Sequence, residues 1–429
     1  MTFRSKFFTV ILFVIALVLS CGPQRINAAQ PLAKITVEAG NHIRIDTPVC
    51  VSLKDISQQI ISHGRNSALR LEEVNGAIRI PVAMQIEQQG EGSVLWWILS
   101  GTTPAGSKRS YELLQGSPVK GSDMAMVKDV EIVKDDKAVL LKKGDEKILQ
   151  YNHAVVPPPK GKSDLYKRSG FIHPLWSSSQ MVLTNSHPRD HCHHMGIWMP
   201  WTHTKFEGKQ VNFWDLKGGQ GTVRFVKFLS TVSGSVYAGF QAEQEHVALQ
   251  TRDGEKVVLR EVWDVRVYNV GGPEKGYRIV DFVSTQKNVA KTPLYQDKYR
   301  YGGFGFRGAG EWDEKTAAYL TSEGKNRKNG HATRARWCDT SGSINGQWAG
   351  VIHMSHPKNF RHPESMRIWP SGQMFFNWAP SQLGEWVMEP GKSYVFRYRM
   401  YVHEGKVDVS VAERAWNDFG NPPVVRLEK

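Results

Sequence analysis

The chain lacks the signatures of several large enzyme classes. It contains no phosphate-binding loop, dinucleotide fingerprint, nucleophile elbow or H-E-x-x-H motif, so we expect neither ATP hydrolysis, Rossmann-type NAD binding, serine-esterase chemistry nor zincin proteolysis. Only four of its 429 residues are cysteines, and their spacings fit no zinc motif. No apolar run of about 20 residues follows the N-terminal segment, which excludes a protein with several membrane-spanning helices.

Acidic side chains are also in deficit. The chain has 55 Lys and Arg against 41 Asp and Glu, a net charge of +14. A positive surface favours an anionic partner such as an acidic polysaccharide. The basic residues are spread along the chain rather than gathered in one arm, so no nucleic-acid partner is expected.

The N-terminus has the pattern of an export signal. Arg4 and Lys6 precede an apolar run over residues 7–19, which is too short to span a bilayer comfortably. Val18-Leu19-Ser20-Cys21 then resembles a bacterial lipobox, with ordinary cleavage near Ala28 as the alternative. We therefore predict a leader over residues 1–29 and export to the periplasm or outer membrane of a Gram-negative bacterium. A lipid on Cys21 would be the only membrane contact.

The rest of the chain predicts an all-β protein. Its 14 tryptophans and 39 glycines favour sheets joined by tight turns. Short strand patterns over residues 35–149 predict a small β-sandwich domain spanning 30–150. Three prolines at 157–159 favour an extended boundary segment. Residues 151–429 are expected to form a large antiparallel, supersandwich-like domain, ending in a short helix capped by Ser410 and stopped by Gly420.

A histidine-rich run is the leading candidate for an active site. Buried imidazoles need hydrogen-bond partners, so a core strand would not carry them at this density. The run is open to three interpretations, namely a metal site, metal-free acid–base chemistry, or a polar network that holds a loop. We assign His191, His193 and His194 to catalysis, and we take His191, His193 and His203 as the candidate ligands of a divalent metal.

Other residues supply carboxylates, rings and cations. Glu207 and Glu261 are candidate catalytic acids for a hydrolase, with Asp215 as a further carboxylate. Tryptophan faces beside polar groups suit sugar surfaces. The candidate substrate-binding residues are Trp198, Trp201, Asp215, Arg307, His356, Arg361 and His362. Arg300 in the Gly-rich segment 299–307 is a second candidate carboxylate binder, and Cys192 is expected to be a small buried thiol.

Several motifs resemble one bacterial family. They are R-S-G-F-I-H-P-L-W-S (168–177), D-H-C-H-H-M-G-I-W (190–198), F-E-G (206–208), N-F-W-D (212–215) and H-P-K-N-F-R-H-P (356–363). Together they resemble the DUF6807 family, whose members are often labelled "methane oxygenase PmoA". The family resemblance covers residues 151–402 and implies a secreted β-sandwich protein of polysaccharide-degrading bacteria. This chain has Cys192 and Met195 where the family pattern usually has another histidine or an aromatic residue.

These observations predict an exported carbohydrate-active enzyme. Acid–base chemistry at the His-rich cleft would cleave or modify a glycosidic substrate, as a lyase or as a hydrolase. The substrate would be an oligosaccharide or polysaccharide, and the net charge favours an acidic one. Two alternatives stay open. One is a glycan-binding lipoprotein without catalytic activity, and the other is a metal-dependent oxidase.

Overall fold

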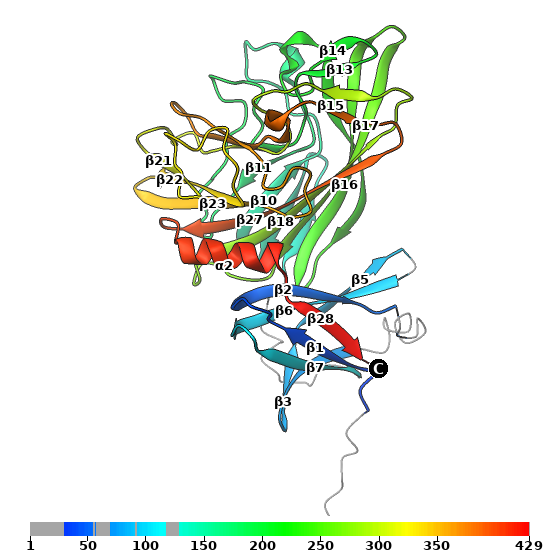
Figure 1. Cartoon of the computed structure of the whole chain (residues 1–429), viewed down its shortest axis with the longest axis vertical. Coiled ribbons are helices and arrows are strands. Elements are labelled where there is room, and N and C mark those ends of the chain that lie inside the picture. Colours follow the sequence, from blue (N-terminus) through cyan, green and yellow to red (C-terminus); the bar gives the residue numbers. More distant parts are fainter. Residues whose placement is uncertain (1–29, 55, 57–68, 91, 117–127, 429) are drawn as a thin grey trace, which may run out of the picture.

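The computed structural model describes residues 30–54, 56, 69–90, 92–116 and 128–428. The predicted leader and Cys21 lie outside these residues. The described chain is built almost entirely from antiparallel β-sheets, as predicted (Figure 1). Within these ranges no helix is long and apolar enough to cross a membrane.

The small domain is a β-sandwich around its own core. A buried cluster that includes Ile35, Leu71 and Trp97 fills the space between its two sheets. In spatial order one sheet is β28 (Val424–Glu428), β1 (Ala33–Glu38), β7 (Lys108–Gln115), β3 (Leu69–Asn75) and β4 (Ile78–Val82). The other is β2 (Arg44–Ser52), β6 (Gly92–Thr103) and β5 (Met84–Gln89).

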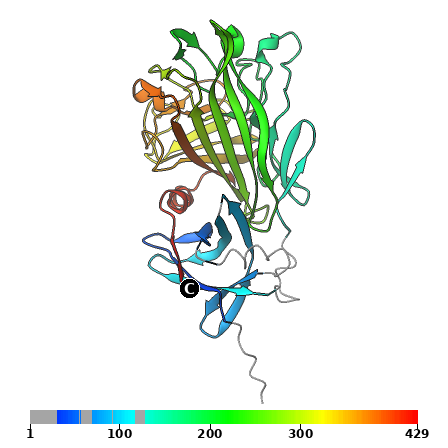
Figure 2. The ribbon, with the colours of Figure 1, turned by 90° about the vertical axis from the view of Figure 1, so that its right-hand side faces the viewer.

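The large domain is a sandwich of two broad sheets. In spatial order the first is β15 (Gly221–Val232), β16 (Tyr237–Thr251), β17 (Gly254–Tyr268), β18 (Tyr277–Asn288), β27 (Ser393–Glu404), β23 (Gln347–Ser355), β22 (Trp337–Ile344) and β21 (Ala317–Thr321). The second is β24 (Met366–Ile368), β25 (Phe375–Trp378), β20 (Gly305–Arg307), β12 (Ile197–Trp198), β11 (Phe171–Leu175), β10 (Glu146–Asn152), β9 (Ala138–Lys143) and β8 (Glu131–Lys134). Figure 2 shows the long strands of the first sheet running side by side.

Smaller elements complete this domain. A short sheet consists of β14 (Lys209–Val211), β13 (Thr204–Phe206), β19 (Leu294–Gln296) and β26 (Trp386–Met388). Three 3-10 turns are η3 (Asp164–Tyr166), η4 (Leu216–Gly218) and η5 (Pro380–Leu383). Helix α2 (Val409–Gly420) ends at the predicted glycine, but Asp408 rather than Ser410 caps it, because the Asp408 carboxylate accepts from the amides of Ser410 and Val411.

The domain boundaries differ from those predicted at residue 150. Strands β8, β9 and β10 precede that point, yet they extend the second large sheet through pairing of β10 with β11. At the other end of the chain, β28 returns to the small domain and pairs with β1. Neither of these two pairings can be predicted from the pattern within a strand. That pattern shows which face of the strand is buried, but not which sheet edge the strand joins. In sequence order, the large domain therefore lies between two segments that form the small domain, and Figure 1 shows β28 beside β1 there.

Arg44 links the two domains at the C-terminal end of α2. Its side chain is 1% exposed. The guanidinium donates to the carbonyl oxygens of Asn417 (2.8 Å) and Asn421 (2.7 Å) and contacts the Asp418 carboxylate at 3.3 Å. A cation at this end satisfies carbonyls that the helix itself leaves without partners. A second link joins Arg266 of β17 to Glu87 of β5, with Nη2 2.9 Å from a carboxylate oxygen.

We expect the return of β28 to hold the small domain together. A chain that ends at Asn421 loses the pairing with β1 and the packing of Val425 and Leu427 against the small core. Two partly buried apolar side chains contribute about 3 kcal/mol to the free energy of unfolding. Urea unfolding of the shortened chain should therefore show a lower midpoint for the small domain. Val424→Ala, at an exposed position of the same strand, is the control and should change little. An unchanged midpoint in the shortened chain would contradict the structural role of β28.

Candidate functional site

A loop between β11 and β12 carries the histidine-rich run. The Ser186–Met195 bridge closes its base. The amide of His187 donates to the His194 carbonyl, and the amide of His194 donates to the His191 carbonyl, both at 2.9 Å. These bonds fold the segment into a compact turn, so the imidazoles are held by backbone geometry.

The loop lies over the outer face of the second large sheet. Ile197, Phe306 and Phe376 are paired across three strands and belong to the main core. Because neighbouring side chains on a strand alternate between faces, Trp198, Arg307 and Phe375 point the other way. On that outer face, Phe171, Met195, Trp198, Trp214 and Phe375 form a separate buried cluster. This cluster is the floor of the candidate site.

Gly305 makes room for the two indoles of the floor. A Cβ at this position would lie 2.7 Å from the Trp214 ring and 3.4 Å from the Trp198 ring. The close approach leaves no space for a larger residue. This glycine of the segment 299–307 therefore serves the packing of the floor.

Arg307 anchors the histidine loop to the sheet. It is 0% exposed, and its Nη2 donates to both oxygens of Asp190 at 2.7 Å. Nη1 lies 3.3 Å from Nδ1 of His194. Burial alone would raise the pKa of Asp190, but Arg307 outweighs this effect and lowers it. The guanidinium is thus engaged within the protein, so it is not free to hold a substrate anion as predicted.

Asp190 in turn orients His191. Its Oδ2 lies 3.0 Å from Nδ1 of His191. A carboxylate at Nδ1 favours the tautomer that carries its proton there and leaves Nε2 as the acceptor. The ring stacks on His194 (centroids 4.9 Å apart) and lies 4.6 Å from the Trp369 ring. With 38% of its side chain exposed, His191 can reach both solvent and a bound molecule.

His193 has a second carboxylate behind it. Its Nδ1 lies 3.6 Å from Oδ1 of Asp215, the residue that caps η4. Burial lowers the pKa of His193 to about 4, against the opposing effect of Asp215. The ring of His194 lies edge-on to that of His193 at 4.7 Å. His194 itself is 2% exposed, and burial holds its pKa well below the usual value. Both imidazoles are therefore neutral at neutral pH.

Two aromatic side chains that the sequence-based site lacked, those of Trp369 and Tyr301, lie beside these histidines and their floor. Trp369 packs against His191 and Arg307, and Tyr301 lies 5.2 Å from Trp214. Trp369 follows β24 and begins the sequence W-P-S-G-Q. An aromatic residue next to turn-forming residues is the sequence signal that could have identified it. The guanidinium of Arg300 lies 5.9 Å from the Tyr301 ring. In the described chain this guanidinium forms no ion pair with a carboxylate.

An open hollow of about 540 Å³ adjoins Asp190. The edge of the histidine loop lines it on one side and the Gly372–Gln373 turn lines it on the other. Gln373 also contacts Arg307. The hollow gives a molecule in solvent a route to the side of the loop that carries Asp190. The remaining lining residues are Asn185, His187, Pro188 and Arg189.

Two predicted sugar-stacking residues are buried. Trp198 is 0% exposed in the floor cluster, beneath His194 and Phe375. Trp201 is also 0% exposed and belongs to the main core, where its Nε1 donates to Gln286 at 2.6 Å. The proline between the two tryptophans indicates an irregular backbone, but it does not show whether other segments of the protein cover that backbone. The rings of Trp369 and Tyr301 beside this cluster are only partly buried, so these are the ones that a ligand can reach.

The candidate carboxylates Glu207 and Glu261 lie apart from the histidines. Glu261 is 1% exposed inside the sandwich, where it contacts His246 (2.8 Å) and accepts from Ser284 and Gln286. Glu207 occupies the turn between β13 and β14 and pairs with Lys256 at 2.9 Å. Neither side chain lines the histidine site, so the pairing of carboxylates expected for a hydrolase is not assembled from them.

The loop with His356, Arg361 and His362 serves local structure. Arg361 donates to the carbonyl oxygens of Pro380 (2.8 Å) and Gly384 (2.7 Å). His362 contacts the Ser355 hydroxyl at 3.1 Å, and His356 packs edge-on against Phe419 of α2. Within the described ranges, no hydrogen bond, ion pair or ring contact joins this loop to the His191–His194 turn. The structure therefore does not bring these three candidate substrate-binding residues to the histidines.

The proposed metal ligands also separate. His203 lies outside the turn that carries His191 and His193, and its ring stacks on that of Tyr299 with the centroids 3.6 Å apart. In the described part of the chain, no group of three or more His, Cys, Asp or Glu residues is placed to hold a metal ion. Cys192 is buried, as expected, and Cys50, Cys192 and Cys338 are all free thiols.

Comparison with known proteins gives a family and remote likenesses to solved structures. A family model described as "family of unknown function (DUF6807)" matches residues 138–417, which is more than half of the chain. The chain belongs to the DUF6807 family. The matched region of this DUF6807 protein begins at β9 and ends inside α2, so it contains the first broad sheet, all of the second except β8, and the histidine loop.

Curated proteins show no match to the DUF6807 chain. Among solved structures, it is similar to an X-ray structure of a galactose mutarotase related enzyme from Lactobacillus acidophilus, with 10% sequence identity and a TM-score of 0.30. The likeness covers 65% of this chain and 100% of that one.

The buried carboxyl group of Glu364 follows the loop that carries His356 and His362, and it predicts a pH-dependent stability of the fold. Burial raises the pKa of Glu364 to about 7, although Ser355, Tyr398 and Asn359 donate hydrogen bonds to it. Because the folded-state pKa exceeds the unfolded value, folding favours the protonated acid. The stabilisation is complete below the unfolded pKa of about 4.5 and is lost as the pH rises toward 7. The loss amounts to about 3 kcal/mol.

Glu364→Gln removes this proton and its pH dependence. Relative to the parent, the variant should therefore gain about 3 kcal/mol of unfolding free energy between pH 4 and pH 8, measured by urea unfolding. Glu385→Gln changes an exposed carboxylate and is the matched control. A difference between variant and parent that stays constant over this pH range would show that the pKa of Glu364 is the same in the folded and unfolded states.

Proposed function

We propose that this DUF6807 protein is an exported enzyme that transfers a proton to or from a carbohydrate at His191 and His193. The observation that carries the proposal is the chain of contacts from Arg307 to Asp190 to His191. A buried cation fixes a carboxylate, and that carboxylate fixes an imidazole whose Nε2 is left free. This arrangement suits a general base, since the carboxylate stabilises the imidazolium that forms on proton uptake.

The surroundings suit a sugar. Trp369 and Tyr301 offer ring faces, while His193, Asp215 and Gln373 offer hydrogen-bonding groups. Ring faces stack on the C–H surface of a pyranose, and polar groups take its hydroxyls. Arg300 adds a cation without a carboxylate partner at the same edge, which favours an acidic sugar.

A lyase reaction fits these groups better than hydrolysis. Hydrolysis uses two carboxylates across the glycosidic bond, and Glu207 and Glu261 lie elsewhere. In the proposed step, His191 Nε2 removes the proton from the carbon next to the substrate carboxylate, and Arg300 stabilises the enolate. The glycosidic C–O bond then breaks, a C=C bond forms, and the leaving oxygen takes a proton from the Tyr301 hydroxyl. Burial raises the pKa of Tyr301, so its phenol keeps that proton at neutral pH.

Substitutions in the contact chain should separate turnover from binding. With uronate-containing oligosaccharides, His191→Asn and Asp190→Asn should lower kcat by about 10²–10⁴-fold with little change in KM. Product formation is followed by mass spectrometry and by the ultraviolet absorbance of the unsaturated sugar. His42→Asn, in the small domain, is the control and should retain full activity.

Other outcomes point to the other functions. A parent protein that binds these oligosaccharides but forms no product would instead be a glycan-binding protein. Turnover that depends on a metal found by elemental analysis of the purified protein would replace the histidine base with metal chemistry.

A further inference from the structure

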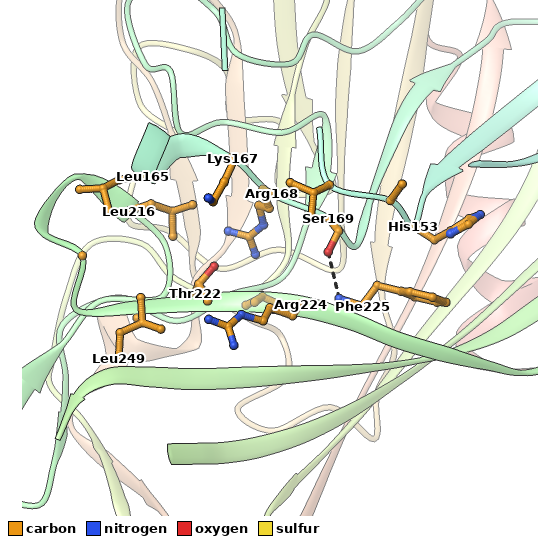
Figure 3. A pocket seen from close by; sticks show the side chains of 15 residues that line it. His153, Leu165, Lys167, Arg168, Ser169, Leu216, Thr222, Arg224, Phe225 and Leu249 are labelled. Carbon is orange, nitrogen blue, oxygen red and sulfur yellow. Dashed lines mark hydrogen bonds between the residues drawn. The ribbon is translucent and has the colours of Figure 1, made fainter. Parts of the chain in front are cut away.

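A separate hollow of about 390 Å³ lies between β15 and the segment that leads into β11 (Figure 3). In Figure 3 Lys167, Arg168 and Thr222 gather at its centre, and Leu165, Leu216 and Leu249 lie on one side. Hollows of this size are typical of sites for small molecules. The structure places η4 at its rim, whereas the histidine turn does not line it.

The lining is basic. Lys167, Arg168 and Arg224 are its charged members, and none of the described lining residues is acidic. Lys167 and Arg224 do have acidic neighbours outside the hollow, Asp164 at 3.5 Å and Glu255 at 2.8 Å. Both pairs are solvent-exposed, and such pairs are weak. A ligand can therefore compete for these cations at little cost.

Arg168 has fewer partners than a buried guanidinium needs. It is 2% exposed. In the described chain, Nη1 donates to the Phe213 carbonyl at 3.3 Å and Nε has no partner. A guanidinium carries five N–H donors, and buried donors without acceptors destabilise the fold. Burial lowers the pKa of Arg168 to about 10, so it is still a cation at neutral pH.

The nearest buried negative charge does not neutralise Arg168 by contact. Glu261 acts on it through space, but the Glu261 oxygens are taken by His246, Ser284 and Gln286. The hollow between the two domains makes the contrast clear. There the lining itself contains carboxylates, and Lys275 pairs with Asp46 at 2.6 Å while Arg109 pairs with Glu73. The hollow at Arg168 lacks that internal balance.

The other walls suit an organic body rather than a bare ion. Leu216 and Leu249 offer apolar surface, and Thr222 offers a hydroxyl. The Ser169 oxygen accepts from the Phe225 amide at 3.0 Å, as Figure 3 shows, so its own proton is free to be donated. A molecule with one anionic end and a partly apolar body matches this distribution.

We propose that this hollow is a binding site for a small organic carboxylate. The carboxylate accepts hydrogen bonds from Arg168 and Lys167, and the body of the ligand lies between the leucines and Thr222. A sugar acid and an aromatic acid both carry this chemistry. The site is distinct from the histidine turn, and the proposal does not depend on the catalytic function assigned there.

Titration calorimetry of the intact protein tests the site. The probes are D-glucuronate and benzoate, with D-glucose as the uncharged control and inorganic sulfate as the bare anion. We expect glucuronate or benzoate to bind at least 10-fold more tightly than glucose and sulfate. Which of the two acids binds identifies a sugar acid or an aromatic acid as the ligand. Equal affinity for all four probes, or no binding, overturns the proposal.

Variants in the hollow locate the binding. Thr222→Glu adds a competing carboxylate and should weaken binding at least 10-fold. Thr222→Gln introduces a side chain of the same shape as Glu without the charge, and it should keep most of the binding. Arg168→Gln should abolish binding, and Lys167→Ala should weaken it several-fold. Lys34→Ala, in the small domain, is the control for charge alone. Binding unaffected by Thr222→Glu and Lys167→Ala overturns the proposal even if Arg168→Gln fails to fold. His191→Asn should leave this binding unchanged.

Discussion

The candidate site depends on one ion pair, between Arg307 and Asp190. A guanidinium that rises from a sheet and is closed off from water requires an anion within hydrogen-bond distance. Asp190 meets this requirement only when the histidine loop lies flat on the outer face of the sheet. The loop conformation, the tautomer of His191 and the stacking of His194 on Phe375 all follow from that contact. The ion pair of a buried arginine thus determines where the imidazole of His191 lies at the surface.

The two faces of one sheet have different roles because side chains alternate along a strand. The inner face contributes Ile197 and Phe306 to the sandwich core, and the outer face contributes Trp198 and Arg307 to the site. Another polar group, centred on Glu261, is enclosed between the sheets and contacts only other protein groups. Similar residue types thus form a buried hydrogen-bonded group between the two sheets and a partly exposed group on the outer face. Only their position relative to the sheets distinguishes the two groups.

Local pattern predicted the class of fold and the location of the histidine turn. Apolar residues alternate along residues 257–268, and Trp263 and Val265 lie on the buried face of β17 as this alternation indicates. The same pattern could not show that Glu261 would find His246 and Ser284, because these partners come from neighbouring strands. Trp201 was misplaced for a related reason, since its cover comes from distant segments. The departure of His203 and the loop near Arg361 likewise depends on tertiary packing, as does the contribution of Trp369.

The position of β28 has a consequence for the order of assembly. The pairing of Lys34 with Glu428 joins the two extremes of the described chain. During synthesis the first strand must therefore wait, with one edge unpaired, until the last strand emerges. The sandwich enclosed between them has no such delay, because its sheets are complete once β27 has formed. The large domain can thus reach its native form while the small domain is still incomplete.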